Sequence, residues 1–387
     1  MIVSITACSS ENESSVKGSE NRVMRDITTQ ELIEDMGIGI NLGNTFESCG
    51  NWINKSSVTN YETAWGSPVI TEQMIKGYKD CGFGVMRLPV AWSNMMDKET
   101  YTISPDYVAR VKEVLNWALD SDLYVILNIH YDNGWFSDFA DDKKRDECFK
   151  KYAIWKQLCE EFGDYGDHLM FESLNEEGGW EELWNRYTNE GDKQKSYSIL
   201  NEINQKFVDI IRKSGINADG TKNNNYYRML LIPGYDTNLH QTCGDKYSNK
   251  AGDKYTNNPT EPNDDYTYTM PTDVSENGIS KLFVSIHYYD PLGWGIAKTS
   301  ATYETPKGTS TFKDTWGSEE DYAAMAEDFE SIKEAYTSKG YGVIFGEFGC
   351  VSVNKDGIPE YFKEFFQSCQ KYGAVPVMWD EGGIVDR

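Results

Sequence analysis

Three glutamates stand close together in the stretch MFESLNEEGGW, at positions Glu172, Glu176 and Glu177. They follow an apolar run, and Asn175 and a glycine pair lie beside them. Like charges repel, so such a cluster indicates either that the side chains diverge or that one of them serves in catalysis. Another carboxylate, Glu347, follows a second apolar run in the stretch GVIFGEFG. Two carboxylates that face each other can act as nucleophile and general acid, if their surroundings push their pKa values apart.

Short apolar runs recur along the chain, and each ends in polar or aromatic residues. Runs of this kind are typical of strands that are buried on both faces. They occupy residues 37–43, 84–90, 123–130, 169–176, 228–235, 282–289, 342–349 and 374–380. Patterns typical of helices lie between them, at 71–82, 105–121, 145–162, 196–214, 319–338 and 358–372. Thr71 and Ser104–Pro105 are suitable helix starts.

This alternation of strands and helices predicts a parallel (β/α)8 barrel, the TIM-barrel architecture. A doubly wound sheet is the alternative, but no GxGxxG sequence follows the first run. Residues 236–281 are polar and weakly periodic, so we expect a loop-rich crossover there. The sequence ends shortly after Asp380, which leaves no room for an eighth helix. We therefore expect a truncated last unit, with the outer face of the last strand exposed unless something else covers it.

The predicted strand ends carry the residues that could do chemistry. In a barrel of this type, the catalytic side chains lie at the carboxyl ends of the strands. Those ends hold Arg87, His130, Asn175, Glu176, His287, Tyr289, Glu347 and Trp379. Two of the four histidines in the chain are among them. The strand ends therefore predict a mouth lined with carboxylates, cations, hydrogen-bonding groups and an aromatic ring.

Glu176 and Glu347, on the fourth and seventh strands, would face each other across this mouth. If their carboxyl groups lie about 5 Å apart, they suit a glycosidase that works by double displacement. One carboxylate attacks the sugar carbon, and the other protonates the leaving oxygen and later deprotonates water. Arg87 and the Tyr289 hydroxyl could keep the nucleophile ionised, while the anionic nucleophile raises the pKa of the acid.

The same residues carry a resemblance to a known family. The stretches NLGNTFES, ETAWGSPV, MRLPVAW, LNIHYDNGW, FESLNEE, SIHYYDP, FGEFG and VMWD resemble glycoside hydrolase family 5, which is rich in endoglucanases. The resemblance runs from about Gly37 to Asp380 and implies Glu176 as acid/base and Glu347 as nucleophile. It also implies that Asn175 binds the sugar 2-hydroxyl and that Trp379 stacks under the sugar. The remaining residues of the set, Arg87, His130, His287 and Tyr289, would shape the reacting subsite.

One position departs from the family pattern. The family commonly has Asn-Glu-Pro on the fourth strand, and Glu177 stands here in place of the proline. Glu177 is therefore a second candidate for the acid/base. Side chains in a strand alternate between its faces, so Glu172 and Glu176 share one face and Glu177 does not. We expect Glu172 to lie lower in the barrel beside a cation such as Arg87, and Glu177 to turn outward.

The resemblance implies an endo-acting, retaining β-1,4-glycan hydrolase that needs no cofactor or metal. Cellulose-type and mixed-linkage glucans are the first choice of substrate, followed by xyloglucan, xylan and mannan. A catalytically inactive carbohydrate-binding barrel is one rival interpretation, and the intact glutamate pair argues against it. A metal-dependent hydrolase is another, but two histidines at the strand ends are too few for most such sites. Sugar platforms could also be provided by loop tryptophans, namely Trp52, Trp135, Trp180 and Trp294.

Charge and composition narrow the choice of partner. Lys and Arg number 37 against 62 Asp and Glu, which gives a net charge of −25. A field of that sign repels phosphate backbones, so nucleic acid is an unsuitable partner, whereas a neutral polymer is not repelled. We expect no membrane span, because no later segment is apolar over about 18 residues. We also expect a monomer.

The first residues resemble the end of a bacterial lipoprotein signal. The segment Ile5–Cys8 ends in the cysteine that such signals acylate, and the polar residues that follow, up to residue 21, read as a flexible tether. A mistaken start or a cloning remnant is the equally weighted alternative. We expect residues 22–387 to form the catalytic domain, secreted or held at the cell surface by a lipid at Cys8.

Overall fold

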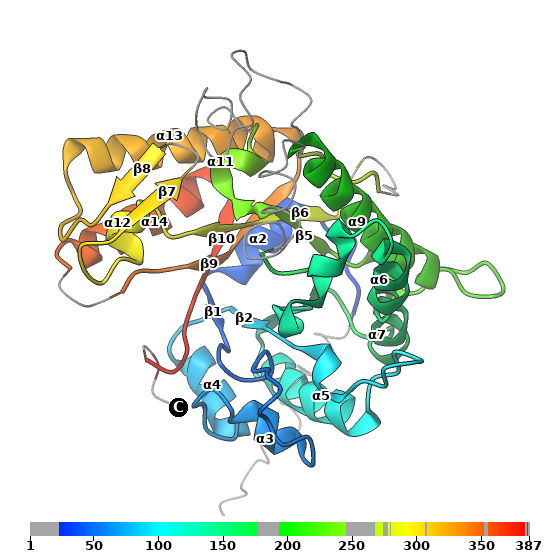
Figure 1. Cartoon of the computed structure of the whole chain (residues 1–387). Helices are drawn as coiled ribbons and strands as arrows, with labels where there is room; N and C mark the ends of the chain where they lie inside the picture. The colour runs from blue at the N-terminus through cyan, green and yellow to red at the C-terminus, as the bar shows by residue number, and fades with distance from the viewer. Residues whose placement is uncertain are drawn as a thin grey trace, which may run out of the picture.

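A computed structural model describes residues 23–176, 193–244, 268–273, 278, 280–305, 308–351, 355–383 and 385. Eight strands form a closed barrel in which neighbouring strands are parallel and the first strand pairs with the last (Figure 1). They are β1 (Gly39–Asn41), β2 (Val85–Leu88), β3 (Tyr124–Asn128), β4 (Leu169–Glu172), β5 (Leu230–Asn238), β6 (Leu282–Tyr288), β9 (Gly342–Phe348) and β10 (Ala374–Met378). The predicted (β/α)8 barrel is confirmed, and β5 alone extends past the end of its predicted run.

The helices that cover the barrel also follow the prediction, with one exception. Five of them are α4 (Glu72–Asp80), α5 (Pro105–Asp120), α9 (Lys193–Ser214), α13 (Glu319–Ala335) and α14 (Ile358–Tyr372). The predicted starts are confirmed, because Thr71 accepts a hydrogen bond from the Met74 amide and Pro105 occupies the first turn of α5. The single helix predicted over 145–162 is wrong: it is α6 (Arg145–Tyr152) followed by α7 (Trp155–Glu161). No proline or glycine between them explains the break.

Shorter elements lie in the connections between the strands and the long helices. The short helices are α3 (Val58–Glu62), α10 (Asn224–Tyr227), α11 (Leu239–Thr242) and α12 (Leu292–Gly295), with 3-10 turns η1 (Trp92–Met95), η2 (Asp132–Ala140) and η3 (Thr337–Lys339). An antiparallel hairpin of β7 (Thr302–Thr305) and β8 (Gly308–Thr311) lies beside α12 (Figure 1). Much of the predicted crossover over 236–281 lies outside the described residues. None of the described helices is long and apolar enough to cross a membrane.

Helix α2 (Thr29–Met36), which the sequence analysis did not predict, closes the amino-terminal end of the barrel. It starts with a capping box, in which Thr28 and Glu31 bond each other's backbone amides. Leu32 and Met36 are fully buried and join the cluster of inward-facing strand residues that includes Val377. Burying two such side chains contributes about 1.5–3 kcal/mol each, which is enough to hold a two-turn helix in place.

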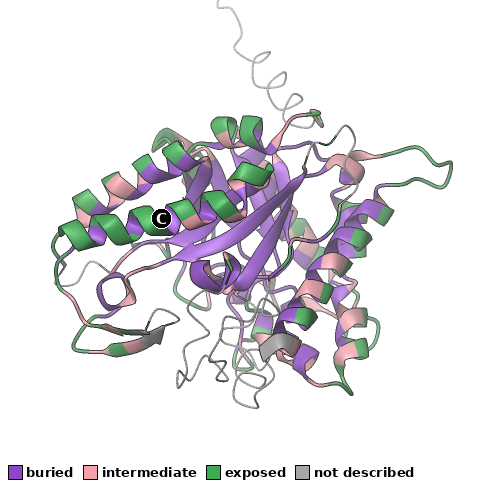
Figure 2. Cartoon of the chain, turned by 90° about the horizontal axis from the view of Figure 1, so that it is seen from above, coloured by how far each residue is buried: buried purple, intermediate pink, exposed green. Residues whose placement is uncertain are grey.

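The last strand is covered, so the expectation of an exposed outer face is wrong. In the described part of the chain no helix follows β10, but α14 packs against the outer face of this strand. Ala374 and Met378, which belong to the cluster between sheet and helices, are 5% and 8% exposed. Figure 2 shows the barrel strands buried throughout, with the helices presenting buried faces to them and exposed faces to solvent. The sheet is therefore a rigid frame for the residues at its carboxyl end.

Candidate active site

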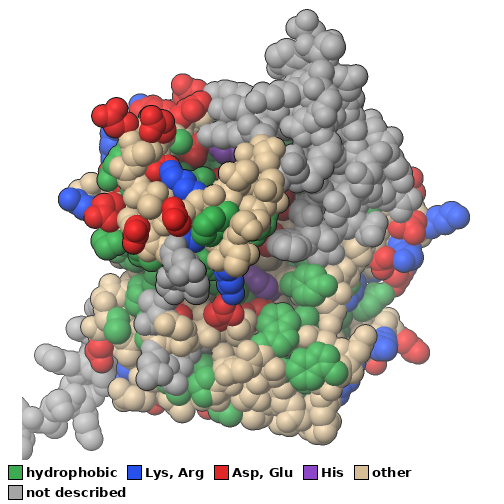
Figure 3. Space-filling view, turned by 60° about the vertical axis from the view of Figure 1, so that its left-hand side comes forward, with side chains coloured by type: hydrophobic (Ala, Val, Ile, Leu, Met, Phe, Trp, Pro, Cys, Tyr) green, Lys and Arg blue, Asp and Glu red, His purple; other side chains and the backbone are tan. Residues whose placement is uncertain are grey.

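The side chains at the carboxyl ends of the strands surround a hollow in the surface. Figure 3 shows this hollow, with a histidine side chain inside it, acidic side chains nearby and hydrophobic side chains along one edge. A concave site with a few converging polar groups is the usual form of a catalytic pocket.

Glu347 is aimed into the hollow by a bulge in β9. His287 of β6 pairs with Glu347 while Ile286 pairs with Phe345, so β9 carries Gly346 as an extra residue. The pairing with β10 is shifted at the same point. A side chain at position 346 would lie 3.1 Å from His287 Nε2, which is tighter than ordinary contact. Gly346 therefore lets the two strands approach closely enough to place Glu347 beside His287.

Glu347 is 6% exposed and both of its oxygens accept hydrogen bonds. Arg87 Nη1 donates to Oε1 at 3.0 Å, and the Tyr289 hydroxyl donates to Oε2 at 3.0 Å. His287 Nδ1 lies 3.6 Å from the same Oε2 atom. These donors offset the cost of placing a carboxylate in a site of low dielectric.

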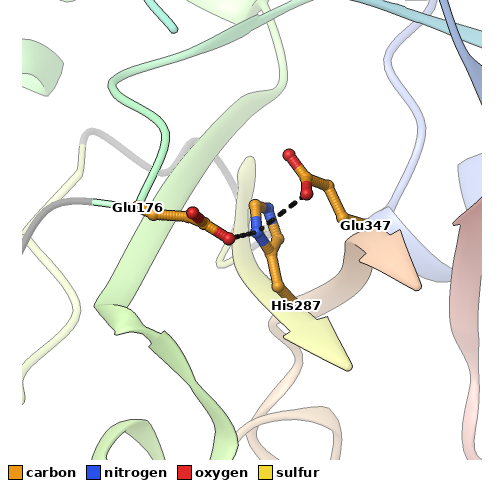
Figure 4. Close-up of side chains that lie close together, drawn as sticks. All are labelled: Glu176, His287 and Glu347. Carbon is orange, nitrogen blue, oxygen red and sulfur yellow. Dashed lines mark hydrogen bonds and ion pairs between the residues drawn. The ribbon is translucent and has the colours of Figure 1, made fainter. Parts of the chain in front are cut away.

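Glu176 lies just beyond the end of β4, on the other side of His287. Its Oε1 atom is 2.7 Å from His287 Nδ1, so the imidazole stands between the two carboxylates (Figure 4). One oxygen of Glu176, one of Glu347 and a ring nitrogen of His287 all lie within 4.8 Å of one another. At this distance the ring nitrogen can donate to the ionised form of Glu176 or accept from its protonated form.

Arg87 is fully buried below these carboxylates and connects four side chains. It donates from Nε to Glu172 at 2.7 Å, from Nη1 to Asn41 at 2.9 Å as well as to Glu347, and from Nη2 to Asn175 at 2.7 Å. Arg87 is thus both the partner of the deeper carboxylate, Glu172, and a donor to Glu347. The expectation that Glu172 lies lower in the barrel beside a cation is confirmed.

The surroundings of Glu347 pull its pKa in opposite directions. Burial has the largest effect and raises the pKa, and the neighbouring Glu176 raises it further. The charges of His287 and Arg87 and the hydrogen bond from Tyr289 lower it, and the net shift is upward. Burial also raises the pKa of Tyr289 well above its usual value, so its hydroxyl stays protonated as a donor.

His130 and Trp379 form an aromatic wall of the hollow. Their rings stack with centroids 5.8 Å apart and an interplanar angle of 11°. Burial, followed by the charges of Arg87 and His287, holds the pKa of His130 well below its usual value, so this imidazole is neutral. Gly43 makes room for the indole, because a side chain there would lie 3.1 Å from the Trp379 ring.

The structure brings the predicted site residues together at one end of the barrel. Six of them, Arg87, Asn175, Glu176, His287, Tyr289 and Glu347, are joined by the contacts above, and His130 and Trp379 stack beside them. Their catalytic and binding roles stay predictions. Glu177 lies outside the described residues, so its expected outward orientation is untested.

Several polar residues around the site escaped the sequence analysis. Asn41, Asn128 and Ser285 are fully buried and bond to Arg87 or Glu172. Asn128 and Ser285 each precede a predicted site histidine by two residues, so the alternation of faces in a strand could have identified them.

Asp236 also escaped notice. It lies within β5, in the register shift between Pro233 and Asn238, and it and Thr237 have positive φ angles of 55° and 45°. Burial and the nearby Glu176 raise the pKa of Asp236 well above its usual value. No sequence pattern signals that conformation.

The predicted tryptophan platforms have different outcomes. Trp52 is 69% exposed in the loop after β1, as a platform requires. Trp135 is half-buried, with its indole nitrogen donating to Asp132 at 2.8 Å. Trp294 is fully buried and donates to the Asp356 carbonyl, so its prediction as a platform is wrong. Trp180 lies outside the described residues.

The donor set does not favour a metal ion. One nitrogen and two carboxylate oxygens are few ligands, and both oxygens of Glu347 already accept hydrogen bonds from Arg87 and Tyr289. The same geometry suits proton transfer and nucleophilic attack, because two carboxylates share one small space with a histidine between them.

The chain matches the model of one protein family, described as "Cellulase (glycosyl hydrolase family 5)", over residues 47–383. Endoglucanase A of Paenibacillus barcinonensis is 31% identical to it, over 93% of this chain and 84% of that protein. A xyloglucan-specific endo-β-1,4-glucanase of Bacteroides ovatus is 29% identical, over 94% of this chain and 67% of that protein.

Solved structures resemble the chain along nearly its whole length. A broad-specificity endoglucanase of family 5, subfamily 4, from an uncultured bovine rumen ciliate has a TM-score of 0.72 at 33% identity, covering 92% of this chain and 90% of that one. Another, from Ruminococcus champanellensis with bound cellotriose, has a TM-score of 0.73 at 28% identity, covering 93% and 91%.

Proposed function

Because the chain belongs to glycosyl hydrolase family 5, we propose that it hydrolyses internal β-1,4-glycosidic bonds of glucans with retention of configuration. The observation that carries this proposal is the separation of Glu176 and Glu347, whose oxygens approach within 4.8 Å. A retaining enzyme needs carboxyl groups about 5–5.5 Å apart, whereas an inverting one needs about 6.5–9.5 Å to hold a water between them.

In the first step, the Glu347 carboxylate attacks the anomeric carbon while Glu176 donates its proton to the glycosidic oxygen. The glycosidic bond breaks, its electron pair goes to the leaving oxygen, and a glycosyl ester forms on Glu347. In the second step, Glu176 takes a proton from water, the water oxygen attacks the anomeric carbon, and the ester bond breaks. Both glutamates then return to their starting forms.

The other residues bind and orient the reacting sugar. Asn175 already accepts from Arg87 through its oxygen, so its NH2 group is left to donate to the sugar 2-hydroxyl. Trp379, stacked on the neutral His130, offers a flat apolar surface beneath the ring. Arg87 and Tyr289 hold the charge that returns to Glu347 when the ester breaks.

The relatives support glucans as the substrate class. Those described above are endoglucanases, one is specific for xyloglucan, and one solved neighbour holds cellotriose. We therefore rank cellulose-type and mixed-linkage glucans first, xyloglucan second, and xylan and mannan after them. The exposed Trp52 would extend the binding surface for polymers. Digestion of each polymer, with the products sized, ranks these substrates and separates internal from terminal cleavage.

A rescue experiment tests the mechanism. Azide can replace a missing acid/base but not a missing structural carboxylate. Glu176→Ala is expected to lose most activity on polymers, to keep hydrolysing glycosides with very good leaving groups, and to regain rate with azide. Glu177→Ala is the matched control and is expected to keep most of its rate. Rescue at position 177 would instead assign the acid/base there.

The stereochemistry provides a separate test. Proton NMR of early products from a soluble β-glucan is expected to show the β-anomer before mutarotation. An initial α-anomer would overturn the retaining mechanism while leaving glucan hydrolysis intact.

We also propose that the protein acts outside the cytoplasm, tethered by a lipid at Cys8, because polymers of this size do not enter cells. Support comes from the sequence pattern of Ile5–Cys8, which lies outside the described residues. Expression in a bacterial host with a radiolabelled fatty acid tests this. Label is expected in the native chain and absent from Cys8→Ser, and equal labelling of both would overturn the anchor.

A further inference from the structure

Below the two catalytic carboxylates lies a third one that takes no part in the mechanism above. Glu172 is fully buried and accepts three hydrogen bonds. Arg87 Nε and Asn128 Nδ2 donate to its Oε2 atom at 2.7 and 3.0 Å, and the Ser285 hydroxyl donates to Oε1 at 3.0 Å. An ionised carboxylate only accepts, so three donors and no acceptor match the charged form.

A single guanidinium thus serves two carboxylates. Arg87 donates to Glu172 through Nε and to Glu347 through Nη1. All three side chains are buried, so solvent screens their charges only weakly. The trio carries one positive and two negative charges. The negative charge of Glu172 therefore cancels part of the electrostatic attraction between Arg87 and Glu347. The bond at Nε also fixes the guanidinium plane that points Nη1 at Glu347 and Nη2 at Asn175.

We propose that Glu172 is a positioning residue that limits and directs the attraction of Arg87 for Glu347, and so keeps the Glu347 carboxylate reactive. The inference rests on the proposed role of Glu347 as nucleophile. If Arg87 had no second carboxylate partner, its full positive charge would stabilise the ionised Glu347 and make it a poor nucleophile. Glu172 balances part of that cation, so Glu347 keeps enough basicity to attack the anomeric carbon.

Other charged and titratable groups around Glu347 also influence its pKa. His287 and Tyr289 face it from β6 and the residue that follows, and Glu176 faces it from the end of β4. His130, after β3, acts on Arg87, and Asp236, within β5, acts on Glu176. From β1 and from the residue after β10 come Asn41 and Trp379, which carry no charge. A substitution at position 172 leaves all these groups in place.

Glu172→Gln removes the charge with little change of shape. The amide oxygen can accept from Arg87 and Asn128, and the amide NH2 can donate to the Ser285 hydroxyl, which then acts as acceptor. The nucleophile is followed by trapping with a 2-deoxy-2-fluoro cellobioside that carries a dinitrophenolate leaving group. Glu347 attacks the anomeric carbon, dinitrophenolate departs with the bond pair, and the fluorine slows hydrolysis of the resulting ester.

The inactivation rate is measured against pH, and mass spectrometry identifies the labelled residue. In wild type the rate is expected to fall at acidic pH as Glu347 becomes protonated. In Glu172→Gln this acidic limb is expected to move to lower pH by roughly one unit, because Glu347 loses a neighbouring anion and gains the undivided charge of Arg87. The plateau rate is expected to fall several-fold, because the nucleophile is less basic. An unchanged limb, or a shift to higher pH, would overturn the inference.

Glu62→Gln is the matched control. Glu62 is also a buried glutamate paired with an arginine, Arg110, at 2.7 Å, but the pair joins α3 and α5 away from the site. This variant is expected to lower the melting temperature and to leave the acidic limb unchanged. An equal shift of the acidic limb in both variants would result from a general loss of stability, and it would overturn the inference.

A second variant covers the case in which Glu172→Gln does not fold. Arg87→Gln combined with Glu172→Gln removes both charges of the deeper ion pair at once, and Glu347 keeps Tyr289 and His287 as neighbouring donors. Glu347 then loses its cation, and the acidic limb is expected to move to higher pH, opposite to the single variant. A limb at the wild-type position would overturn the inference. Failure to label Glu347 in wild type would be a different result, since it would overturn the proposed function.

Discussion

At the scale of single residues, the chemistry depends on Glu347 being buried and yet ionised. Removing a carboxylate from water costs several kcal/mol, and charge-assisted hydrogen bonds recover much of that cost. Arg87 and Tyr289 supply these bonds, one to each oxygen. The balance between burial and these donors sets the pH at which the nucleophile becomes available.

Tyr289→Phe tests this balance. The hydrogen bond from Tyr289 lowers the pKa of Glu347, so its loss raises that pKa. Attack requires the ionised form, so the acidic limb of kcat/KM is expected to move to higher pH, by roughly one unit. Tyr288→Phe is the control, because Tyr288 is a buried neighbour that donates to Asp328 instead. An acidic limb that stayed in place in Tyr289→Phe would show that this hydroxyl does not tune the nucleophile.

Trp379→Ala tests the sugar platform. The indole is partly exposed at the mouth and stacks on His130 at 5.8 Å, so its loss removes a flat surface without opening the barrel core. Activity on polymer is expected to fall more than tenfold, which corresponds to about 1.4 kcal/mol of transition-state stabilisation. Trp379→Phe keeps a ring and is expected to recover part of the rate. A folded Trp379→Ala with near wild-type activity would make this residue ordinary packing.

At the scale of elements, the strands were predictable and their irregularities were not. A strand buried on both faces must be apolar along its length, and YVILN in β3 shows this directly. The bulge at Gly346 depends on pairing with β6 and β10 together, which no local pattern encodes. Helix α2 was missed because only a few of its residues are buried, although Thr28 and Glu31 have the spacing of a capping box.

The site was predictable to a similar extent. Alternation along the expected run 169–176 predicted that Glu172 lies below Glu176. The strand in fact ends at Glu172, and beyond it Asn175 and Glu176 both reach the site, which alternation could not predict. Arg87 of β2 donates to Glu172 of β4 and to Glu347 of β9. The sequence pattern of a single strand cannot predict contacts that join three strands inside the barrel.

Thr28→Ala tests the contribution of α2. The change removes the side chain that accepts from the Glu31 amide, and loss of such a cap costs about 1 kcal/mol. The free energy of unfolding, measured with denaturant, is expected to fall by about that amount while kcat stays the same, because α2 lies at the opposite end of the barrel from the site. Thr28→Ser keeps the hydroxyl and is expected to retain most of the stability. A fall in kcat would mean that α2 shapes the mouth.

At the scale of the whole molecule, the net charge of −25 determines the electrostatic force between the protein and a polymer that approaches it. It does not act on a neutral glucan, and it repels an anionic one over a distance that salt shortens. This repulsion acts on association and leaves the bond-breaking steps at the glutamates unchanged.

Salt dependence is therefore expected to differ between two forms of one polymer. With hydroxyethyl cellulose, kcat/KM is expected to stay constant as sodium chloride rises from about 10 mM to about 300 mM, over which the screening length falls several-fold. With carboxymethyl cellulose it is expected to rise over the same range. Equal responses to salt would show that the substrate does not experience the overall charge, or that salt acts on the fold.

The pairing of β1 with β10 has a consequence for how the protein is made. Gly39 pairs with Val377 and Ile40 with Met378, so the barrel joins residues from opposite ends of the chain. During synthesis, β1 emerges from the ribosome long before β10 is translated, so the edge of β1 that pairs with β10 stays unpaired until then. The edge of β9 is equally open until β10 arrives, and unpaired strand edges invite contacts with other chains. The nascent chain is therefore most vulnerable to aggregation just before residue 378 leaves the ribosomal tunnel, when an otherwise complete sheet still lacks the strand that closes it.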